Sequence, residues 1–188
     1  CCPAWVKFCE TRYPEFRKHI STCRSPQQMF GAVIKEEARM KAEEDGRRTV
    51  MVSIMPCTAK KAEISRPEHF TDGEQDVDFV LTTSEIAEMI KTTGLDLKHV
   101  TPEALDMPFG MSSGAGAIFG TTGGVTEAVL RYVTNSIKPE QMEEIKFSGV
   151  RGNDAVKEAT VNLGDRDVRI AIVHGLANAA ELLEKMKA

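Results

Sequence analysis

Three cysteines in two short motifs are the residues of this 188-residue chain whose types and spacing are best suited to chemistry. Cys1 and Cys2 stand side by side before Pro3, and Cys57 follows a methionine and a proline. Successive side chains leave the backbone in different directions, so adjacent cysteines are expected to serve different tasks. Pro3 fixes its own φ and restricts the residue before it. We therefore expect one thiolate of the pair to bind a metal while the other thiol carries a proton.

A metal at these cysteines is one of two interpretations that the spacing leaves open. Thiolates are soft ligands that select iron–sulfur clusters, zinc or copper(I). Cys2 and Cys57 each lie in a loop beside a proline, but buried cysteines also pack as small hydrophobic residues. A cubane cluster needs about four ligands, so two cysteines are too few. Cys9 and Cys23 lie in segments expected to be helical and are predicted to be core residues.

Composition argues against several classes of partner. The formal net charge of −4 at pH 7 disfavours nucleic acid and anionic membrane surfaces. No apolar run approaches the roughly 20 residues of a membrane span. Five cysteines are too sparse, and odd in number, for a disulfide scaffold, which favours a reducing cytoplasmic compartment. The histidines show no zinc spacing and are expected to be ordinary surface or core residues: His19, His69, His99 and His174.

The elements that must position the cysteines alternate between helix and strand. Strands are expected at 49–54, 78–82, 145–150, 156–163 and 168–173. Helices are expected over 4–20 with an interruption near Pro14, from Ser25-Pro26 to about 46, over 84–92, through Ala128 to about 135, and over 175–186. This alternation predicts an α/β fold with mixed or parallel sheets flanked by helices. Cys57 then follows the carboxyl end of the first strand, where α/β folds place ligand sites. Residues 60–76 and 94–112 are expected to be irregular.

A glycine-rich stretch runs from Gly114 to Gly124. Gly114, Gly116 and Gly120 are spaced as G-x-G-x-x-x-G without a clear strand before them, which does not match a dinucleotide-binding loop. Two interpretations remain open. The stretch is either a helix N-terminus whose bare N–H groups approach an anionic or strongly polar group, or a place of tight helix packing.

Several polar residues are weaker candidates. Lys60 follows Cys57 by three positions, so its ammonium group is placed to donate to an anionic ligand of a metal centre, although a lysine taken alone is more often a surface residue. Other residues suit a proton path by type, but their spacing does not establish one: Ser21, Thr22, Glu36 and Glu63.

Taken together, the motifs resemble those of the iron-only (FeFe) hydrogenases. The resemblance is carried by Cys1-Cys2-Pro3-Ala4-Trp5 and by Met55-Pro56-Cys57-Thr58-Ala59-Lys60-Lys61-Ala62-Glu63. It continues through 25–28, 78–83, 113–125, 150–152 and 158–159, and so spans essentially the whole chain. It implies the two-lobed catalytic domain of that family and the reaction 2H⁺ + 2e⁻ ⇌ H₂.

The resemblance also implies a cofactor and roles for single residues. The family's H-cluster is a 4Fe–4S cubane joined through a cysteine to a two-iron unit with CO, cyanide and a dithiolate bridge. By motif, Cys2 and Cys57 are expected to bind the cubane, Cys1 to pass protons to the dithiolate, and Lys60 to hydrogen-bond a cyanide. Ser21 and Glu63 match positions near the proton path. The pocket around the two-iron unit is expected to include Met55, Pro56, Pro26, Gln27 and Phe119.

The partners implied by the family are ferredoxin or NADH-linked electron-transfer subunits, and hydrogenase maturation proteins. The family's third motif, which supplies two further cubane cysteines, is absent from the 188 residues, as is the segment before the cysteine pair. We therefore expect residues 1–188 to be a partial catalytic domain that cannot complete an H-cluster alone. Two alternatives are a Narf-like iron–sulfur protein of cluster assembly and a sensory hydrogenase homologue. Cys1 and the glycine-rich stretch favour the enzyme, because a Narf-like protein is expected to lose one of them.

Overall fold

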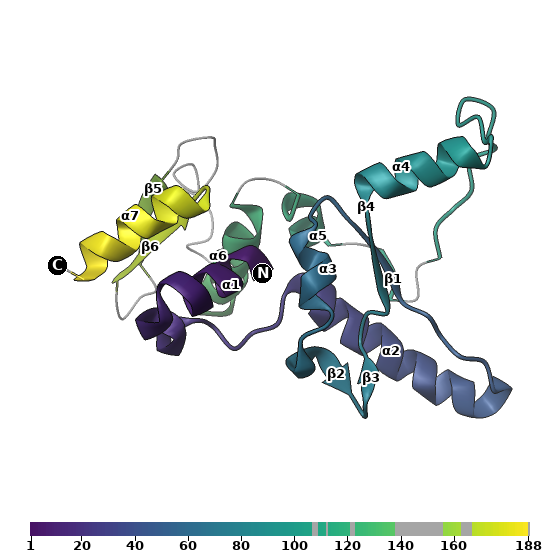
Figure 1. Ribbon diagram of the computed structural model, residues 1–188, viewed down its shortest axis with the longest axis horizontal. Coiled ribbons are helices and arrows are strands. Elements are labelled where there is room, and N and C mark those ends of the chain that lie inside the picture. Colours follow the sequence, from purple (N-terminus) through teal and green to yellow (C-terminus); the bar gives the residue numbers. More distant parts are fainter. Residues whose placement is uncertain (107–108, 112, 121–122, 138–155, 163–166, 188) are drawn as a thin grey trace. The chain divides into compact units, whose positions relative to one another are not determined.

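The chain folds into two units, Cys1–Glu103 and Ala104–Ala188, in a computed structural model (Figure 1). The structure describes residues 1–106, 109–111, 113–120, 123–137, 156–162 and 167–187.

The first unit opens with a helix that begins at the cysteine pair. Helix α1 spans Pro3–Arg12, with Cys2 as its N-cap and proline at its first position. The Cys2 Sγ accepts a hydrogen bond from the Trp5 N–H at 3.4 Å. The helix ends before Pro14, which opens the 3₁₀ helix η1, Pro14–His19. The expected interruption near Pro14 is confirmed, because proline disfavours helical backbone at the residue before it.

A parallel pair of strands forms the centre of the first unit. Strand β1, Val52–Met55, pairs with β4, Phe79–Thr82, in the register Val52↔Phe79 to Met55↔Thr82. The long helix α2, Pro26–Asp45, packs against the segment that leads into β4. A Cβ at Gly31 of this helix would lie only 2.5 Å from the Val77 side chain. Only glycine therefore allows α2 to approach this closely.

Helix α4, Thr83–Thr92, follows β4 without a loop and is fixed by a capping box. The Thr82 hydroxyl accepts from the Glu85 N–H at 3.2 Å, and the Glu85 carboxylate accepts from the Thr82 N–H at 2.7 Å. Hydrogen bonds from Lys61 and from Thr82 lower the pKa of Glu85 to about 2. The stabilisation from this carboxylate is therefore complete above its ordinary pKa of 4.5 and is lost as the pH falls toward 2.

The expectation that residues 60–76 are irregular is wrong. They contain α3, Ala59–Glu63, the 3₁₀ helix η2, Pro67–His69, and a hairpin of β2, Phe70–Thr71, and β3, Glu74–Gln75. Asp72 and Gly73 form the turn at positive φ values of 51° and 83°. Elements this short show no hydrophobic periodicity, so the sequence pattern did not reveal them.

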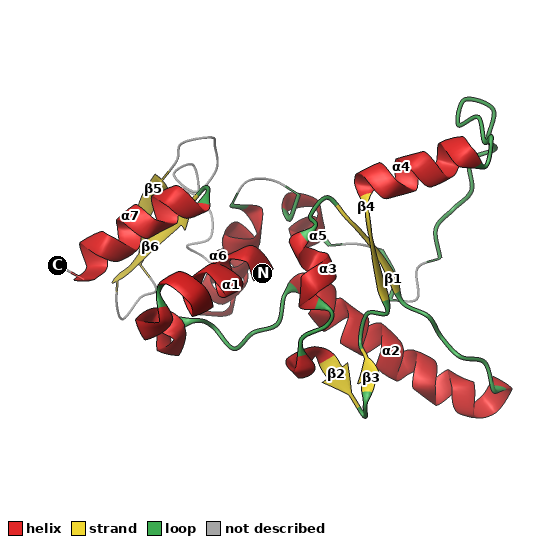
Figure 2. Cartoon of the chain, in the orientation of Figure 1, coloured by secondary structure: helices red, strands yellow, loops and turns green. Residues whose placement is uncertain are grey.

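The second unit contains a short helix, a longer helix and an antiparallel strand pair with a final helix (Figure 2). Its elements are α5, Gly114–Ile118; α6, Gly124–Ile137; β5, Val156–Asn162; β6, Asp167–Val173; and α7, Leu176–Lys187. Strands β5 and β6 pair in the register Val156↔Val173 to Asn162↔Asp167. The strand expected at 145–150 lies outside the described residues. The remaining strands and helices expected in this part of the chain are confirmed, with ends shifted by one or two residues.

The two sheet types confirm the α/β expectation of mixed and parallel sheets with helices. Among the described residues, no helix is both long enough and apolar enough to span a bilayer.

Candidate functional site

Lys60 joins the two cysteine motifs. It lies on α3, one turn after Cys57, and the residue is only 8% exposed. Its Nζ donates to the backbone carbonyl of Cys1 at 2.8 Å and lies 3.1 Å from the Glu63 carboxylate. Residues separated by 59 positions in the chain are thereby held together.

Glu63 is the centre of a buried polar cluster with Lys60 and Ser25. The Ser25 hydroxyl donates to Glu63 Oε2 at 3.0 Å, and Oε2 also accepts from Lys60. The backbone N–H of Gln28 donates to Ser25 Oγ at 3.4 Å, so Ser25 also caps α2. All three cluster residues are buried. Each charge is therefore paired, as burial in a low dielectric requires. Ser25 was expected as a helix start, but its place in the site was missed.

This cluster makes Lys60 important for stability. Replacing Lys60 by methionine leaves a buried carboxylate without its cation, and we expect this to cost about 3–5 kcal/mol of unfolding free energy. Urea unfolding of the full-length protein without its iron–sulfur cofactor measures this loss of unfolding free energy. The matched control is Lys41→Met, which breaks an exposed pair with Glu37 (2.6 Å) and should cost less than about 1 kcal/mol. Equal losses in the two variants would contradict the role of the buried pair.

A cavity of about 390 Å³ lies beside this cluster in the first unit. Four residues that the motifs singled out line it: Cys1, Cys2, Ser21 and Glu63. The structure therefore brings together three residues expected to handle protons and one expected to bind iron. Residues that sequence reasoning did not place here also line it: Glu10, Arg17, Arg24, Ser25, Arg66, Glu68 and His69.

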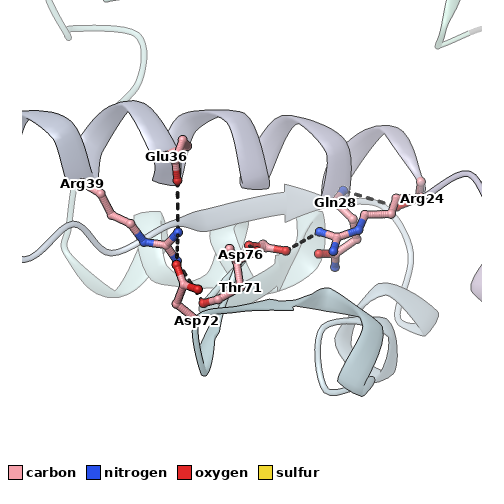
Figure 3. A network of polar contacts seen from close by, with 8 residues as sticks. Arg24, Gln28, Glu36, Arg39, Thr71, Asp72 and Asp76 are labelled. Carbon is pink, nitrogen blue, oxygen red and sulfur yellow. Dashed lines mark hydrogen bonds and ion pairs between the residues drawn. The ribbon is translucent and has the colours of Figure 1, made fainter.

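Two ion pairs build the wall of this cavity. Arg66 binds both carboxylate oxygens of Glu10, at 2.6 and 3.0 Å, and so ties the segment after α3 to α1. These hydrogen bonds lower the pKa of Glu10 and, together with the bond to Glu68, raise the pKa of Arg66. Arg24 pairs with the buried Asp76, as Figure 3 shows.

Asp76 extends this support into the hairpin. It accepts a hydrogen bond from the Thr71 hydroxyl at 2.7 Å (Figure 3). The loop before α2, which carries Ser21 and Arg24, is therefore anchored to the hairpin after α3.

Gln27 shows the feature expected of a residue that faces a ligand. It is 5% exposed, and its Oε1 accepts from the Ser53 hydroxyl at 3.0 Å. Its Nε2 is buried and has no hydrogen-bond partner among the described residues. Such an unsatisfied donor is unusual in a folded protein and fits an acceptor such as a cyanide or carbonyl ligand.

The other expected pocket residues are spread over both units. Pro26 is half-buried at the start of α2, Met55 is half-buried at the end of β1, and Pro56 is exposed in the loop that follows. Phe119 follows α5 and belongs to the second unit, so its place in the pocket stays a prediction. A Cβ at Gly114 would meet no atom within 4 Å, so this glycine makes no tight packing contact with the described residues.

The five cysteines differ in how far their thiols are exposed. All five lie in described residues as free thiols. Cys2 is exposed and Cys57 is half-buried, both outside regular elements. Cys9 is fully buried in α1, and burial raises the pKa of its thiol, which confirms the core prediction and disfavours a thiolate ligand. Cys23 was expected in the core, but it is exposed in the loop before α2, because the helix starts only at Pro26.

An iron–sulfur cubane fits part of this donor set. Cys2 and Cys57 are accessible soft ligands on two segments that Lys60 holds together. Among the described residues, no group of three or more His, Cys, Asp or Glu side chains forms a complete metal site. Cys2 and Cys57 would therefore supply two of the about four ligands that a cubane cluster needs.

Comparison with known proteins decides the family. The model of the "Iron only hydrogenase large subunit, C-terminal domain" matches residues 1–188. The chain belongs to this iron-only hydrogenase family. The resemblance seen in the motifs is thereby confirmed.

Relatives in the family have several names. The chain is 45% identical over 184 residues to the NADP-reducing hydrogenase subunit HndD of Solidesulfovibrio fructosivorans, covering 98% of this chain and 32% of that protein. It is 44% identical over 188 residues to the periplasmic [Fe] hydrogenase large subunit of Nitratidesulfovibrio vulgaris, covering 100% and 45%. It is 31% identical over 195 residues to the cytosolic iron-sulfur assembly component 3 of Pongo abelii, covering 99% and 40%. The chain thus spans less than half the length of these relatives.

Solved structures of iron-only hydrogenases share the fold. The apo form of a variant [FeFe]-hydrogenase HydA1 from Chlamydomonas reinhardtii matches with a TM-score of 0.77 at 34% identity, covering 99% of this chain and 54% of that one. A structure that reports stepwise H-cluster assembly in HydA matches equally well. These matches confirm the expected fold class, that of the family's catalytic domain.

Proposed function

We propose that residues 1–188 are part of the catalytic domain of a longer protein that catalyses 2H⁺ + 2e⁻ ⇌ H₂ at an H-cluster. The observation that carries the proposal is the Lys60 bridge, which holds the two cysteine motifs together beside a cavity that Cys1 and Glu63 line. The family membership supports it, since two relatives at 44–45% identity are named as hydrogenases.

The chain's own residues would hold one side of the cofactor. Cys2 and Cys57 would hold two corners of the cubane, and its other two ligands would be further cysteines of the protein. Lys60 and Gln27 Nε2 would donate hydrogen bonds to cyanide or carbonyl ligands, and Met55, Pro56 and Pro26 would line the same pocket. When bound, the cluster supplies the electrons and the iron site at which protons and hydrogen interconvert.

Proton handling falls to Cys1, Ser21 and Glu63. A thiol has a reference pKa of about 8.5, so it exchanges protons near neutral pH more readily than a hydroxyl group does. Cys1 is exposed to the cavity, and Ser21 and Glu63 line the same space. A path along the cavity wall would therefore connect the cluster to solvent.

Electrons would arrive from ferredoxin or from NADH-linked subunits, and maturation proteins would insert the cofactor. The name of the HndD relative, a subunit of an NADP-reducing hydrogenase, favours a multisubunit electron-transfer partner. A cytoplasmic location follows from the sparse cysteines, although one relative is named as periplasmic.

A cluster-assembly protein is the second candidate, favoured by the 31% identity to an iron–sulfur assembly component. It would bind iron and sulfide without a two-iron unit. A sensory hydrogenase homologue is a third candidate, and it would convert protons and hydrogen only slowly. The cavity position of Cys1 favours the enzyme, because neither alternative requires fast proton delivery.

Hydrogen evolution from reduced methyl viologen by the full-length protein, produced with maturation proteins, tests the proposal. We expect hydrogen together with the infrared bands of CO and cyanide. Iron and sulfide without these bands would instead assign cluster assembly. The bands with only trace turnover would assign a sensory role.

A further inference from the structure

His69 is a buried imidazole on the wall of the cavity that Cys1 and Glu63 share. It is the last residue of η2 and is 7% exposed. Its backbone N–H donates to the backbone carbonyl of Arg66 at 3.0 Å, and its own carbonyl accepts from the Asp76 N–H at 3.0 Å. Asp76 also pairs with Arg24, so the segment carrying the imidazole is anchored on both sides of the cavity.

The ring itself has an unused polar atom. Nδ1 of His69 is buried and has no hydrogen-bond partner among the described residues. A buried polar atom left unsatisfied costs about 1–3 kcal/mol, and such atoms often serve water or a functional role. Nδ1 itself is closed to water, so proton exchange with the cavity would use the other ring nitrogen, Nε2. The cavity of about 390 Å³ has room for several waters, each of which occupies about 30 Å³ in the liquid.

Charges of both signs face the imidazole. Glu63 and Glu68 favour its protonated form, while Arg24 and Arg66 disfavour it. Burial has the largest effect and lowers the pKa of His69 below its ordinary value of 6.5. The ring is therefore neutral at pH 7, and its protonated form is a stronger acid than free imidazolium. A group with these properties accepts a proton and releases it again quickly.

Glu63 is suited to be the other end of this exchange. Lys60 and Ser25 both bond its Oε2, and no bond to its Oε1 is found among the described residues. Oε1 therefore remains available to accept a hydrogen bond from cavity water, while Oε2 keeps the carboxylate in place.

We propose that His69 is a proton-relay residue between water in the cavity and the Glu63 carboxylate. This proposal rests on the proposed hydrogenase function. During hydrogen evolution, a hydronium ion protonates the imidazole, and the imidazolium passes its proton through cavity water to Glu63. The neutral imidazole is then restored, and hydrogen oxidation runs the same steps in reverse. No electron is transferred in these steps.

Replacing His69 by glutamine in the full-length holoenzyme tests the relay, because glutamine is polar but does not titrate. His99→Gln is the matched control, since His99 is an exposed histidine paired with Asp96. We expect His69→Gln to slow hydrogen evolution at least about tenfold, within the range that a positioned acid–base group contributes. The loss should shrink at high concentrations of a small buffer acid, while His99→Gln stays near the wild-type rate. A rate within twofold of wild type, or a loss independent of pH and buffer, would overturn the relay.

A measurement that needs no turnover separates the relay from the hydrogenase function. NMR titration follows the His69 ring in the full-length protein without its iron–sulfur cofactor, with and without the substitution Glu63→Gln. We expect the wild-type ring to titrate below pH 6.5 and its midpoint to fall further in Glu63→Gln, because the Glu63 carboxylate favours the protonated ring. A midpoint that does not respond to Glu63→Gln would make the relay wrong even if the enzyme is active. If the midpoint falls but the holoenzyme makes no hydrogen, the function proposal fails while the coupling of His69 to Glu63 stands.

Discussion

Replacing Cys57 by alanine should remove the cubane from the full-length protein and with it all hydrogen production. Cys57 follows β1, and its motif is held against the Cys1–Cys2 motif by Lys60. A cubane needs about four ligands, so losing one thiolate leaves a corner that alanine cannot fill. Losing a residue that only supports a metal ligand already costs about 10–100-fold in metal affinity. Losing the ligand itself should cost at least as much, so we expect iron per chain to fall by at least roughly tenfold in Cys57→Ala.

Iron and sulfide analysis of the purified protein measures this effect. Cys23→Ala is the matched control, because Cys23 is an accessible free thiol in a loop but is not a proposed ligand. We expect this control to keep its full iron content. A normal iron content in Cys57→Ala would remove Cys57 from the ligand set.

The second large effect is expected at Cys1. Cys1→Ser should keep the cluster, because Cys1 is not a proposed ligand and serine has nearly the same shape. The hydroxyl is a far weaker acid than the thiol, so the step that delivers protons should slow by a factor of about 10² or more.

Iron content and the CO and cyanide bands show whether Cys1→Ser still carries the cofactor, and hydrogen evolution shows the loss of turnover. Cys2→Ser, the adjacent substitution, should behave in the opposite way and lose iron. Near-normal turnover in Cys1→Ser would rule out the relay role of this thiol. Loss of iron in Cys1→Ser would instead make Cys1 a ligand.

Long, periodic elements were predictable from the sequence, whereas short polar ones were not. The proline at the start of α2 and the β-branched run of β1 are local signals, and both elements lie where expected within three residues. Helix α3 and the β2–β3 hairpin were missed because five-residue and two-residue elements contain no period to detect. Cys23 was expected in the core because its segment was expected to be helical, but residues 21–25 form a loop before α2 and leave the thiol exposed.

The site shows the same division. Cys1, Cys2 and Cys57 were found because their types and neighbours are rare enough to carry information by themselves. Ser25 and His69 were not, because one was seen only as a helix cap and the other only as an ordinary histidine. Their importance comes from burial and from neighbours far away in the chain, such as Glu63, 38 positions from Ser25.

The sequence by itself determined the family, the α/β class and the division of the cysteine pair into a proposed ligand and a proposed proton carrier. These follow from local motifs and from hydrophobic periodicity, which any stretch of chain carries within itself. Only the tertiary structure decided that the Lys60 ammonium lies between the Cys1 carbonyl and Glu63, and that His69 lines the same cavity. The physical reason is that burial and long-range hydrogen bonds arise only when α1, α3 and the loop before α2 come together, which no local sequence pattern encodes.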